Sequence, residues 1–281
     1  MTPNDGEFYL LKQIPAVLRA RGFRLYTEGG SIMQRSFPRR LIDLWLNGGA
    51  AVLGHTPPNM LCELKNTASR GLYAPLPHFT EARYIKALSK LFPNRCFRLY
   101  AAPPPELITL LKNRAAKLWR PFSDSEENGS LLIPVLPGVQ TWRDNLPLGL
   151  CVVAAKSEDE LAKLPPGDIL SPVLLAAAAR GVHDILGSPQ RANPVLPRTF
   201  KALPEASLQV QTTAQLWQRQ GIYLTQKEKP SPEKWEKLFN KFLEAGFLLP
   251  PIPSHPLILP GELSDGEDAK LAAALSLPDQ Y

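Results

Sequence analysis

Two apolar, β-prone runs lie at the centre of the chain. Residues 131–136 read LLIPVL and residues 148–155 read LGLCVVAA, and the eleven turn-prone residues 137–147 join them. Runs of this kind are typical of buried strands, although periodicity alone also allows a buried helical segment. A parallel neighbour needs a crossover of about a dozen or more residues, so this short connection favours an antiparallel return. Ligands of open α/β sheets bind outside the carboxyl ends of strands, so we expect any chemistry near 137–143 or just past Ala155.

The pattern before the centre predicts alternating short elements. Proline is tolerated at a helix start and serine or threonine is favoured as a helix cap, and these rules set several of the bounds. We expect a short amphipathic helix over Tyr9–Arg21 interrupted near Pro15, strands at Arg24–Tyr26 and Leu41–Leu46, a helix from Pro57–Pro58 to about Ser69, a helix over Glu81–Leu91 capped by Thr80, a strand at Cys96–Ala101 and a helix over Glu106–Trp119.

The pattern after the centre predicts helices and one short strand. Residues 156–163 and Asp168–Leu186 indicate two helices, the second rich in alanine. The apolar residues of Trp235–Leu248 fall on one stripe, which predicts an amphipathic helix that Gly246 ends. Leu257–Leu259 indicates a strand. Ser264, with Glu267 three residues later, forms the capping box of a last helix.

Composition narrows the class of protein. A chain of 281 residues with 44% hydrophobic residues indicates a globular protein, and two unequal domains are the natural expectation. Three cysteines without metal-ligand spacing do not suggest a disulfide framework, which favours a cytoplasmic protein. The first residues lack the basic and apolar regions of a signal peptide, and no apolar run approaches the length of a membrane span.

The net charge of +6 raises the question of a nucleic-acid partner. The arginines form two small clusters, but neither is a long stripe with interleaved aromatic residues. We therefore expect a solvated or anion-facing surface, with nucleic-acid binding as the weaker alternative. The clusters are Arg19, Arg21 and Arg24, and then Arg35, Arg39 and Arg40.

Both ends of the chain resemble the class III aminotransferases, which are fold-type I enzymes that use pyridoxal phosphate. The glutamate-1-semialdehyde aminomutase group is the most similar. Residues 22–98 carry Gly22…Leu25-Tyr26, Gly29-Gly30, Leu41-Ile42-Asp43-Leu44, Gly48–Gly54-His55…Pro58 and Gly71…Ala74-Pro75…Glu81, and residues 215–275 carry a helix, an L-P-P loop, a strand and a final helix.

The resemblance implies a reduced fold-type I α/β architecture. We expect a truncated, mostly parallel central sheet with helices, together with a small α+β domain. Residues 1–48 would pack with the small domain, residues 49–205 would form the reduced large domain, and residues 206–281 would form the small domain. The resemblance also implies a homodimer, or a pairing with a related chain.

The middle of the chain departs from the family at each cofactor-binding feature. The family's hydroxyl-rich phosphate loop is replaced by Ala101–Pro105, and three successive prolines remove three backbone donors. Val139-Gln140-Thr141 resembles the family's D-E-V-Q-T-G strand end, but Pro137 and Gly138 stand in place of the two acids. Residues 145–155 resemble the strand that follows the Schiff-base lysine, yet no lysine lies between Lys117 and Lys156.

Other reactive residues give no recognisable site. His55, His78, His183 and His255 have no carboxylate or cysteine at metal-ligand spacing, and no metal site is expected. The chain also lacks a nucleophile elbow and a phosphate-binding P-loop motif.

We therefore interpret the chain as a shortened, non-catalytic aminotransferase-like protein that uses an inherited dimer surface for binding or regulation. No cofactor is expected in that case. One alternative is an active pyridoxal-phosphate enzyme, with Lys156 as a rebuilt Schiff-base residue or with its site completed by another chain. A second alternative is a small-molecule-binding module in the vestigial cleft. Neither a membrane nor a nucleic acid is an expected partner.

Overall fold

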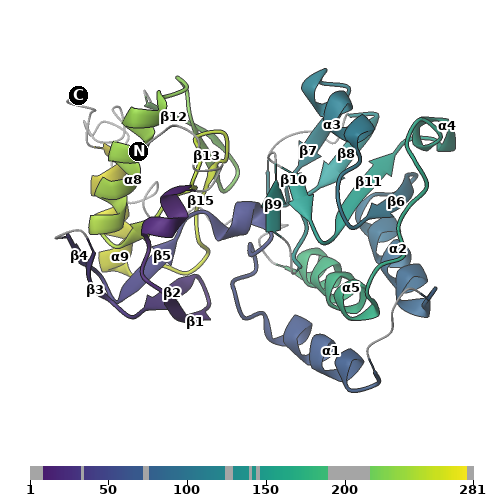
Figure 1. Ribbon diagram of the computed structural model, residues 1–281, viewed down its shortest axis with the longest axis horizontal. Coiled ribbons are helices and arrows are strands. Elements are labelled where there is room, and N and C mark those ends of the chain that lie inside the picture. The colour runs from purple at the N-terminus through teal and green to yellow at the C-terminus, as the bar shows by residue number, and fades with distance from the viewer. Residues whose placement is uncertain are drawn as a thin grey trace. The chain divides into compact units, whose positions relative to one another are not determined.

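The computed structural model describes residues 9–32, 35–71, 76–123, 129–138, 141–143, 146–188 and 216–276. The chain divides into two compact units. One contains residues 1–48 and 193–281, and the other contains residues 49–192. Each unit has its own sheets and helices (Figure 1). Within the described part, no helix is both long enough and apolar enough to cross a membrane.

The unit of residues 49–192 is built on a four-stranded sheet with the order β6-β11-β8-β7. Strand β11 pairs antiparallel with both β6 and β8, while β7 and β8 run parallel. The antiparallel return predicted for the two central runs is therefore confirmed. The strands are β6 (Cys96–Tyr100), β7 (Ala116–Trp119), β8 (Leu131–Pro134) and β11 (Cys151–Ala155).

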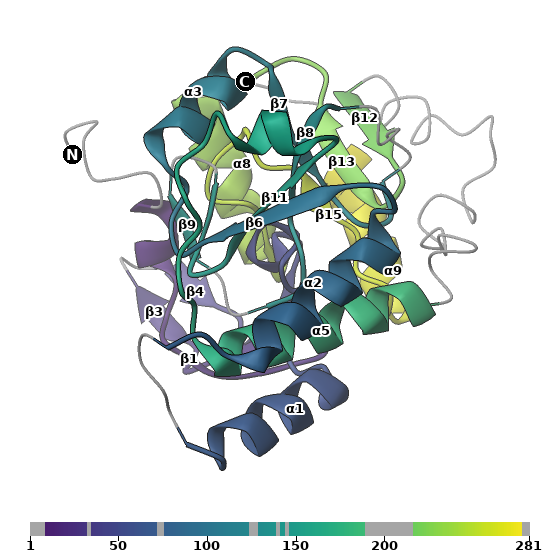
Figure 2. The same ribbon diagram turned by 90° about the vertical axis from the view of Figure 1, so that its right-hand side faces the viewer.

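Helices cover both faces of this sheet because β11 is apolar throughout, and its successive side chains point to opposite faces. Val152 and Ala154 pack with α2 (Phe79–Leu91) and α5 (Pro172–Gly187), and the alternate residues of β11 pack with α3 (Pro105–Lys112) and α4 (Glu158–Leu161). Helix α1 (Pro58–Ala68) lies against α5 on the side away from α2 (Figure 2). Strands β9 (Thr141–Arg143) and β10 (Leu146–Leu148) form a separate hairpin.

The edge strand β6 is covered by the segment that follows α4. The Arg98 guanidinium donates hydrogen bonds to the carbonyls of Leu161 and Leu164, at 2.6 and 2.8 Å. The Asp168 N–H donates to the Leu99 carbonyl at 2.9 Å. This cover leaves less of the β6 edge open to pairing with another strand.

The unit of residues 1–48 and 193–281 joins the two ends of the chain in one sheet. Its order is β1-β2-β5-β14, and β14 pairs parallel with β5. A β3–β4 hairpin lies between β2 and β5 in sequence, and a three-stranded sheet has the order β12-β13-β15. The strands are β1 (Val17–Arg21), β2 (Arg24–Thr27), β3 (Gly30–Ile32), β4 (Arg35–Phe37), β5 (Arg40–Asp43), β12 (Trp217–Gln220), β13 (Tyr223–Gln226), β14 (Phe247–Leu248) and β15 (Leu257–Ile258).

The helices in the described part of this unit are α8 (Pro232–Glu244), α9 (Asp265–Ser276) and two short 3₁₀ segments, η1 (Tyr9–Gln13) and η2 (Leu46–Gly49). The capping box predicted for the last helix is confirmed. The Glu267 N–H donates to Ser264 Oγ at 3.3 Å, and the Ser264 N–H donates to Glu267 Oε2 at 2.9 Å. Both ends of the box are therefore formed.

Three predictions for this unit were wrong in their bounds. Residues 17–21 form a strand paired with β2 rather than the end of a helix, because pairing with β2 supplies hydrogen bonds past Pro15. The strand at 40–43 ends at Asp43, whose carboxylate accepts from the Trp45 and Leu46 N–H groups at 2.8 and 2.9 Å and turns the chain. Residues 247–248 belong to β14, since Gly246 (φ +92°) ends the turn after α8.

Four predictions for the other unit also need correction. The helix expected over Glu106–Trp119 is α3 alone, and residues 116–119 form β7. The helix expected over 156–163 is only the single turn of α4. Helix α2 is capped by His78, whose Nδ1 accepts from the Thr80 N–H at 3.3 Å. Helix α5 begins at Pro172 because Asp168 is occupied elsewhere, accepting from the Ala101 N–H at 2.8 Å.

Candidate functional site

The candidate site is the edge of the central sheet at which three parallel strands end. Because β11 pairs antiparallel with β6 and β8, and β7 is parallel to β8, the carboxyl ends of β6, β7 and β8 share one edge. Ligands of open α/β sheets bind outside this edge. The residues that decide its chemistry are therefore 101–104, 120–123 and 135–138.

The segment after β6 leads into α3 without an anion site. Pro105 is the first residue of α3 and has no N–H, and the helix has no side-chain cap. The Leu107 and Ile108 N–H groups both donate to the Pro104 carbonyl, at 3.0 and 3.2 Å. The exposed Glu106 places a carboxylate in the first turn. Helix N-termini bind phosphate through unsatisfied N–H groups, and at this terminus Pro105 lacks one while those of Leu107 and Ile108 are already used.

The segment after β8 is apolar and packed. Val135, Leu136 and Pro137 are all buried. A Cβ atom added to Gly181 of α5 would lie 3.0 Å from both the Cβ and the carbonyl oxygen of Pro137. Pro137 therefore fills space against α5. Residues 139, 140, 144 and 145 lie outside the described residues. They include Val139 and Gln140, on which the resemblance to the family's strand end partly rests.

The segment after β7 supplies the polar side chains of this edge. It reads Arg120-Pro121-Phe122-Ser123, and Phe122 packs against the core on the α2–α5 face of the sheet. Across residues 101–104, 120–123 and 135–138, the side chains include no lysine and no carboxylate. These residues therefore offer no amine for a carbonyl substrate, while the Asp168 carboxylate, which accepts from the Ala101 N–H at 2.8 Å, reaches this edge from the segment before α5.

Cys151 is a nucleophile type that does lie near this edge, at the start of β11 and opposite Tyr100. Its side chain is fully buried, and burial raises the pKa of the thiol to about 12. Burial also raises the pKa of Tyr84, whose hydroxyl has no hydrogen-bond partner among the described residues. A thiol and a phenol that stay protonated at neutral pH are inert as nucleophile and base. The sequence pattern gave no sign of this pair, because the two residues are far apart in the chain.

Lys156 lies at the opposite edge of the sheet. Ala155 pairs with Cys96 and Leu131, which are the first residues of β6 and β8. Lys156 follows at once, and its N–H donates to the Ser130 carbonyl and to Glu160 Oε2, both at 3.0 Å. The five-residue length of β6 separates this amino edge from the carboxyl edge by roughly 13 Å. The side chain of Lys156 is exposed.

The surroundings of Lys156 are structural. The Arg95 guanidinium donates to the carbonyls of Gly129, Ser130 and Ala154, at 2.8, 3.2 and 3.2 Å. One side chain thus satisfies three carbonyl groups at the amino edge of the sheet. This arrangement holds the ends of strands together.

The four histidines occupy separate places within their own units. His78 caps α2, and His55 lies half-buried in the loop before α1. His183 is half-buried on α5, where burial and then the charge of Lys90 lower the pKa of its imidazole. His255 is buried, and its Nδ1 accepts from Trp45 Nε1 at 3.1 Å. No group of side chains within the described ranges could hold a metal ion.

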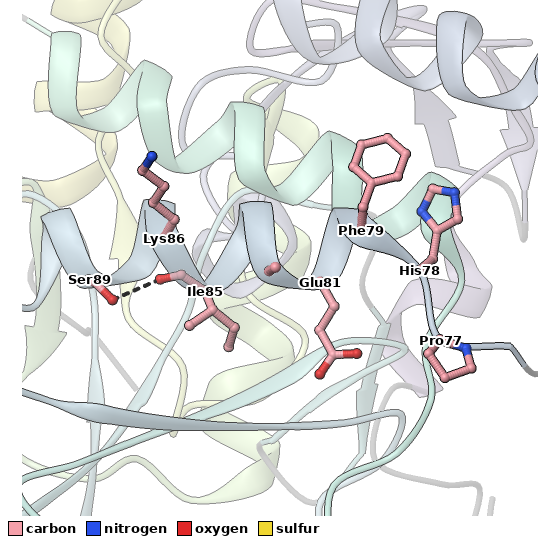
Figure 3. Close-up of a pocket in the computed structure, with 8 residues that line it drawn as sticks. Pro77, His78, Phe79, Glu81, Ile85, Lys86 and Ser89 are labelled. Atoms are coloured by element: carbon pink, nitrogen blue, oxygen red, sulfur yellow. Dashed lines mark hydrogen bonds between the residues drawn. The ribbon is translucent and has the colours of Figure 1, made fainter.

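A hollow of about 760 Å³ lies along the outer face of α2 (Figure 3). Phe79 and Lys86 point to one side of the helix, and Glu81 and Ile85 point to the other. Ligand sites gather polar groups from several elements, whereas the described lining of this hollow comes from one helix and the two residues before it. The hollow therefore shows no convergent chemistry. Its lining is Pro77, His78, Phe79, Glu81, Ala82, Ile85, Lys86 and Ser89.

No protein-family model matches the chain. A functionally uncharacterised protein of Treponema pallidum (strain Nichols) is 29% identical over 297 residues, which cover 89% of this chain and 91% of that protein. Another, of Borreliella burgdorferi, is 34% identical over 83 residues, or 30% of this chain and 28% of that protein. Neither relative has a described activity that could be compared with this chain.

Solved structures share the fold. The acetylornithine aminotransferase of Elizabethkingia anophelis aligns with a TM-score of 0.61 at 10% identity, over 93% of this chain and 92% of that one. The ornithine aminotransferase of Plasmodium yoelii aligns at 0.63 and 9%, with the same coverage. The β-phenylalanine aminotransferase of Variovorax paradoxus aligns at 0.58 and 14%, over 92% and 86%. The predicted α/β fold of class III aminotransferases is therefore confirmed.

The cofactor implied by this fold does not fit the described edge. A related structure, the ornithine aminotransferase of Toxoplasma gondii, has pyridoxal phosphate at partial occupancy in its active site. That group needs a lysine, a carboxylate for its ring nitrogen and donors for its phosphate. Here Lys156 lies at the other edge, Pro137 packs against α5, and Pro105 opens α3. The described residues of this edge supply no lysine, and the polar groups that they do offer are Arg120, Ser123 and the Asp168 carboxylate.

Proposed function

We propose that the chain is a non-catalytic aminotransferase-like protein, related to the glutamate-1-semialdehyde aminomutase group, that acts by binding. The observation that carries this proposal is the composition of the carboxyl edge. Alanine, proline, valine and leucine occupy the positions that the chemistry requires, while Lys156 lies at the amino edge. The aminotransferase-like fold supports the ancestry, and the edge supports the loss of activity.

The order of strands supports a deletion as the cause. Strand β11 pairs directly with β8 in the sheet. The resemblance of residues 145–155 implies that, in the family, a further strand and the Schiff-base lysine precede the segment that begins near Pro147. A direct pairing of the two flanking strands is what their removal would leave. One deletion therefore accounts for both the smaller sheet and the missing lysine.

The proposed binding role relies on the surface that such proteins use to form dimers. A homodimer, or a complex with a related chain, can persist after catalysis is lost, because the dimer surface does not depend on the cofactor. Sedimentation velocity on the purified chain tests this part of the proposal. A dimer has twice the chain mass of 31.1 kDa, and a monomer at every concentration contradicts the homodimer.

A titration with pyridoxal phosphate tests the proposed loss of catalysis. The wild-type chain and a Lys156→Ala variant are each mixed with increasing cofactor, and the absorbance of a protein-bound imine is recorded. We expect both proteins to give the same weak, unsaturable signal, because Lys156 is exposed and far from the carboxyl edge. A saturable band in the wild type that Lys156→Ala abolishes would establish the active alternative.

A further inference from the structure

Strand pairing brings the first arginine cluster of the sequence and Arg40 of the second onto one sheet face. Arg19 of β1 lies opposite Tyr26 of β2, and Tyr26 lies opposite Arg40 of β5. In the neighbouring row, Arg21 lies opposite Arg24. Directly opposite residues share a side of the sheet, and so do residues two apart on one strand. We call Arg19, Arg21, Arg24, Tyr26 and Arg40 the arginine face.

The other side of the same strands is the packed one. Its cross-strand row consists of Ala20, Leu25 and Leu41, and Leu41 is fully buried. On the arginine face, Arg19, Arg21 and Arg40 are exposed, while Arg24 and Tyr26 are half-buried. The guanidinium carbon of Arg19 lies 4.5 Å from the centre of the Tyr26 ring. The arginine face is thus open at its β1 end, whereas Ile42, which lies in the Arg21–Arg24 row, is buried, and one cation–aromatic stack lies in the Arg19–Arg40 row.

Carboxylates offset only part of this charge. Glu267 binds Arg24 at 2.7 Å and Arg40 at 3.2 Å, and Glu262 lies close enough to Arg24 to affect its charge. Within the described residues, neither Arg19 nor Arg21 pairs with a carboxylate. Four guanidinium groups therefore face two carboxylates, and the unpaired arginines are the two on the edge strand β1.

The edge of β1 is poorly suited to receive another strand. The pairing register shifts between Val17 and Arg19, so that Leu18 forms a bulge. Bulges and charged side chains on an edge strand discourage strand addition. A partner of this surface therefore meets the arginine side chains on the face rather than the backbone on the edge.

We propose that the arginine face binds single-stranded nucleic acid. Guanidinium groups bind phosphate through two parallel hydrogen bonds, and all four cations of the face are arginines. The Arg19–Tyr26 stack offers a surface on which a base can stack, as in proteins that bind single strands without sequence preference. The proposal goes beyond the proposed loss of catalysis and does not depend on it. The sequence alone did not bring Arg40 together with Arg19, Arg21 and Arg24, because the pairing register of β1, β2 and β5 cannot be read from it.

Fluorescence anisotropy with a labelled single-stranded oligonucleotide of mixed sequence tests the proposal on the full chain. The test variant is Arg19→Gln with Arg21→Gln. The matched control is Lys112→Gln with Lys163→Gln, which removes two exposed charges from the other unit. For two lost phosphate contacts on a single strand, the slope of log affinity against log salt falls by about 1.4, and binding weakens about tenfold at low salt. The control keeps wild-type affinity.

A Tyr26→Leu variant separates stacking from general charge attraction. It keeps all four arginines, so we expect weaker binding with an unchanged salt slope, since base stacking carries no counterion term. Thermal unfolding checks that each variant remains folded. Wild-type protein that does not bind the oligonucleotide overturns the proposal, and so do equal losses in the arginine and lysine variants. Binding to anionic vesicles that the oligonucleotide does not compete away would instead assign the surface to membranes.

Discussion

At the scale of single residues, packing contacts surround Pro137 and Cys151 near the carboxyl edge. Pro137 fills the space against Gly181, and Cys151 is held in a protonated state by burial. A side chain that must react needs access to the substrate and a pKa suited to the reaction. Both Pro137 and Cys151 are buried instead. The residues that do carry buried charge lie in the other unit, around Glu267.

Glu267 links the last helix to the N-terminal strands. Its carboxylate accepts from Arg24 Nη2 at 2.7 Å and Arg24 Nε at 3.2 Å, and it also accepts from the Ser264 N–H at 2.9 Å. The hydrogen bonds from Arg24, more than any other cause, lower the pKa of Glu267 from 4.5 to about 2. Its charged form is therefore favoured in the folded state, and it stabilises the junction between the two ends of the chain.

The Glu267→Gln variant tests this link. Because the folded pKa is lowered, the stabilisation is fully present above pH 4.5 and is lost as the pH falls through about 2. We expect a loss of about 2 kcal/mol in unfolding free energy at pH 7, since the arginines are partly exposed and screened. Urea unfolding at several pH values measures it, and the difference from wild type should narrow below pH 4.5.

The exposed Glu228 provides the control for this measurement. A Glu228→Gln variant removes the same charge without a buried ion pair, so we expect a change within about 0.5 kcal/mol. An equal effect of the two variants, or a Glu267→Gln effect that persists unchanged to low pH, would contradict the proposed role of the carboxylate.

At the scale of elements, two sequence signals with a local physical cause were correct, whereas the cap predicted at Thr80 was wrong because His78 caps α2. The capping box at Ser264–Glu267 and the proline start of α1 involve neighbouring residues, and the structure contains both. The helix expected over 106–119 failed because its second half pairs with β8, a contact that depends on a segment far along the chain. Arg114, with a φ of +60°, lies in the turn that follows the helix. Because that position is not a glycine, the sequence gave no signal of the turn.

The contact between α5 and the end of β8 gives a prediction at this scale. A Cβ at Gly181 would lie 3.0 Å from the Pro137 carbonyl oxygen and 3.1 Å from Met60 Sδ, whereas a Cβ at Gly187 of the same helix meets nothing within 4 Å. Alanine normally stabilises a helix by up to about 1 kcal/mol relative to glycine. We expect Gly187→Ala to raise the melting temperature and Gly181→Ala to lower it. The overpacking at Gly181 should reduce the free energy of unfolding by about 1–3 kcal/mol.

Thermal unfolding by circular dichroism compares the two variants directly, since both change the same residue type in one helix. If Gly181→Ala is as stabilising as Gly187→Ala, the space beside Pro137 is not filled. The vestigial cleft would then be open, and the small-molecule alternative would gain support.

At the scale of the whole molecule, the sequence predicted the fold better than the site. The resemblance at the two ends led to the aminotransferase-like architecture, because turn glycines and helix caps are set by local backbone geometry. The missing lysine and acids were also visible in the residue order. The position of Lys156 at the amino edge was not, since the pairing of β11 with β6 and β8 decides which edge it occupies. The arginine face depends on strand register in the same way.

The central claim is that the fold persists without a site for pyridoxal phosphate. Borohydride trapping tests it most directly: the chain is incubated with the cofactor, reduced, digested and mapped by mass spectrometry. We predict low-level adducts spread over several exposed lysines, with no position dominant. One lysine modified at close to one group per chain, whether Lys156 or another, would contradict the account.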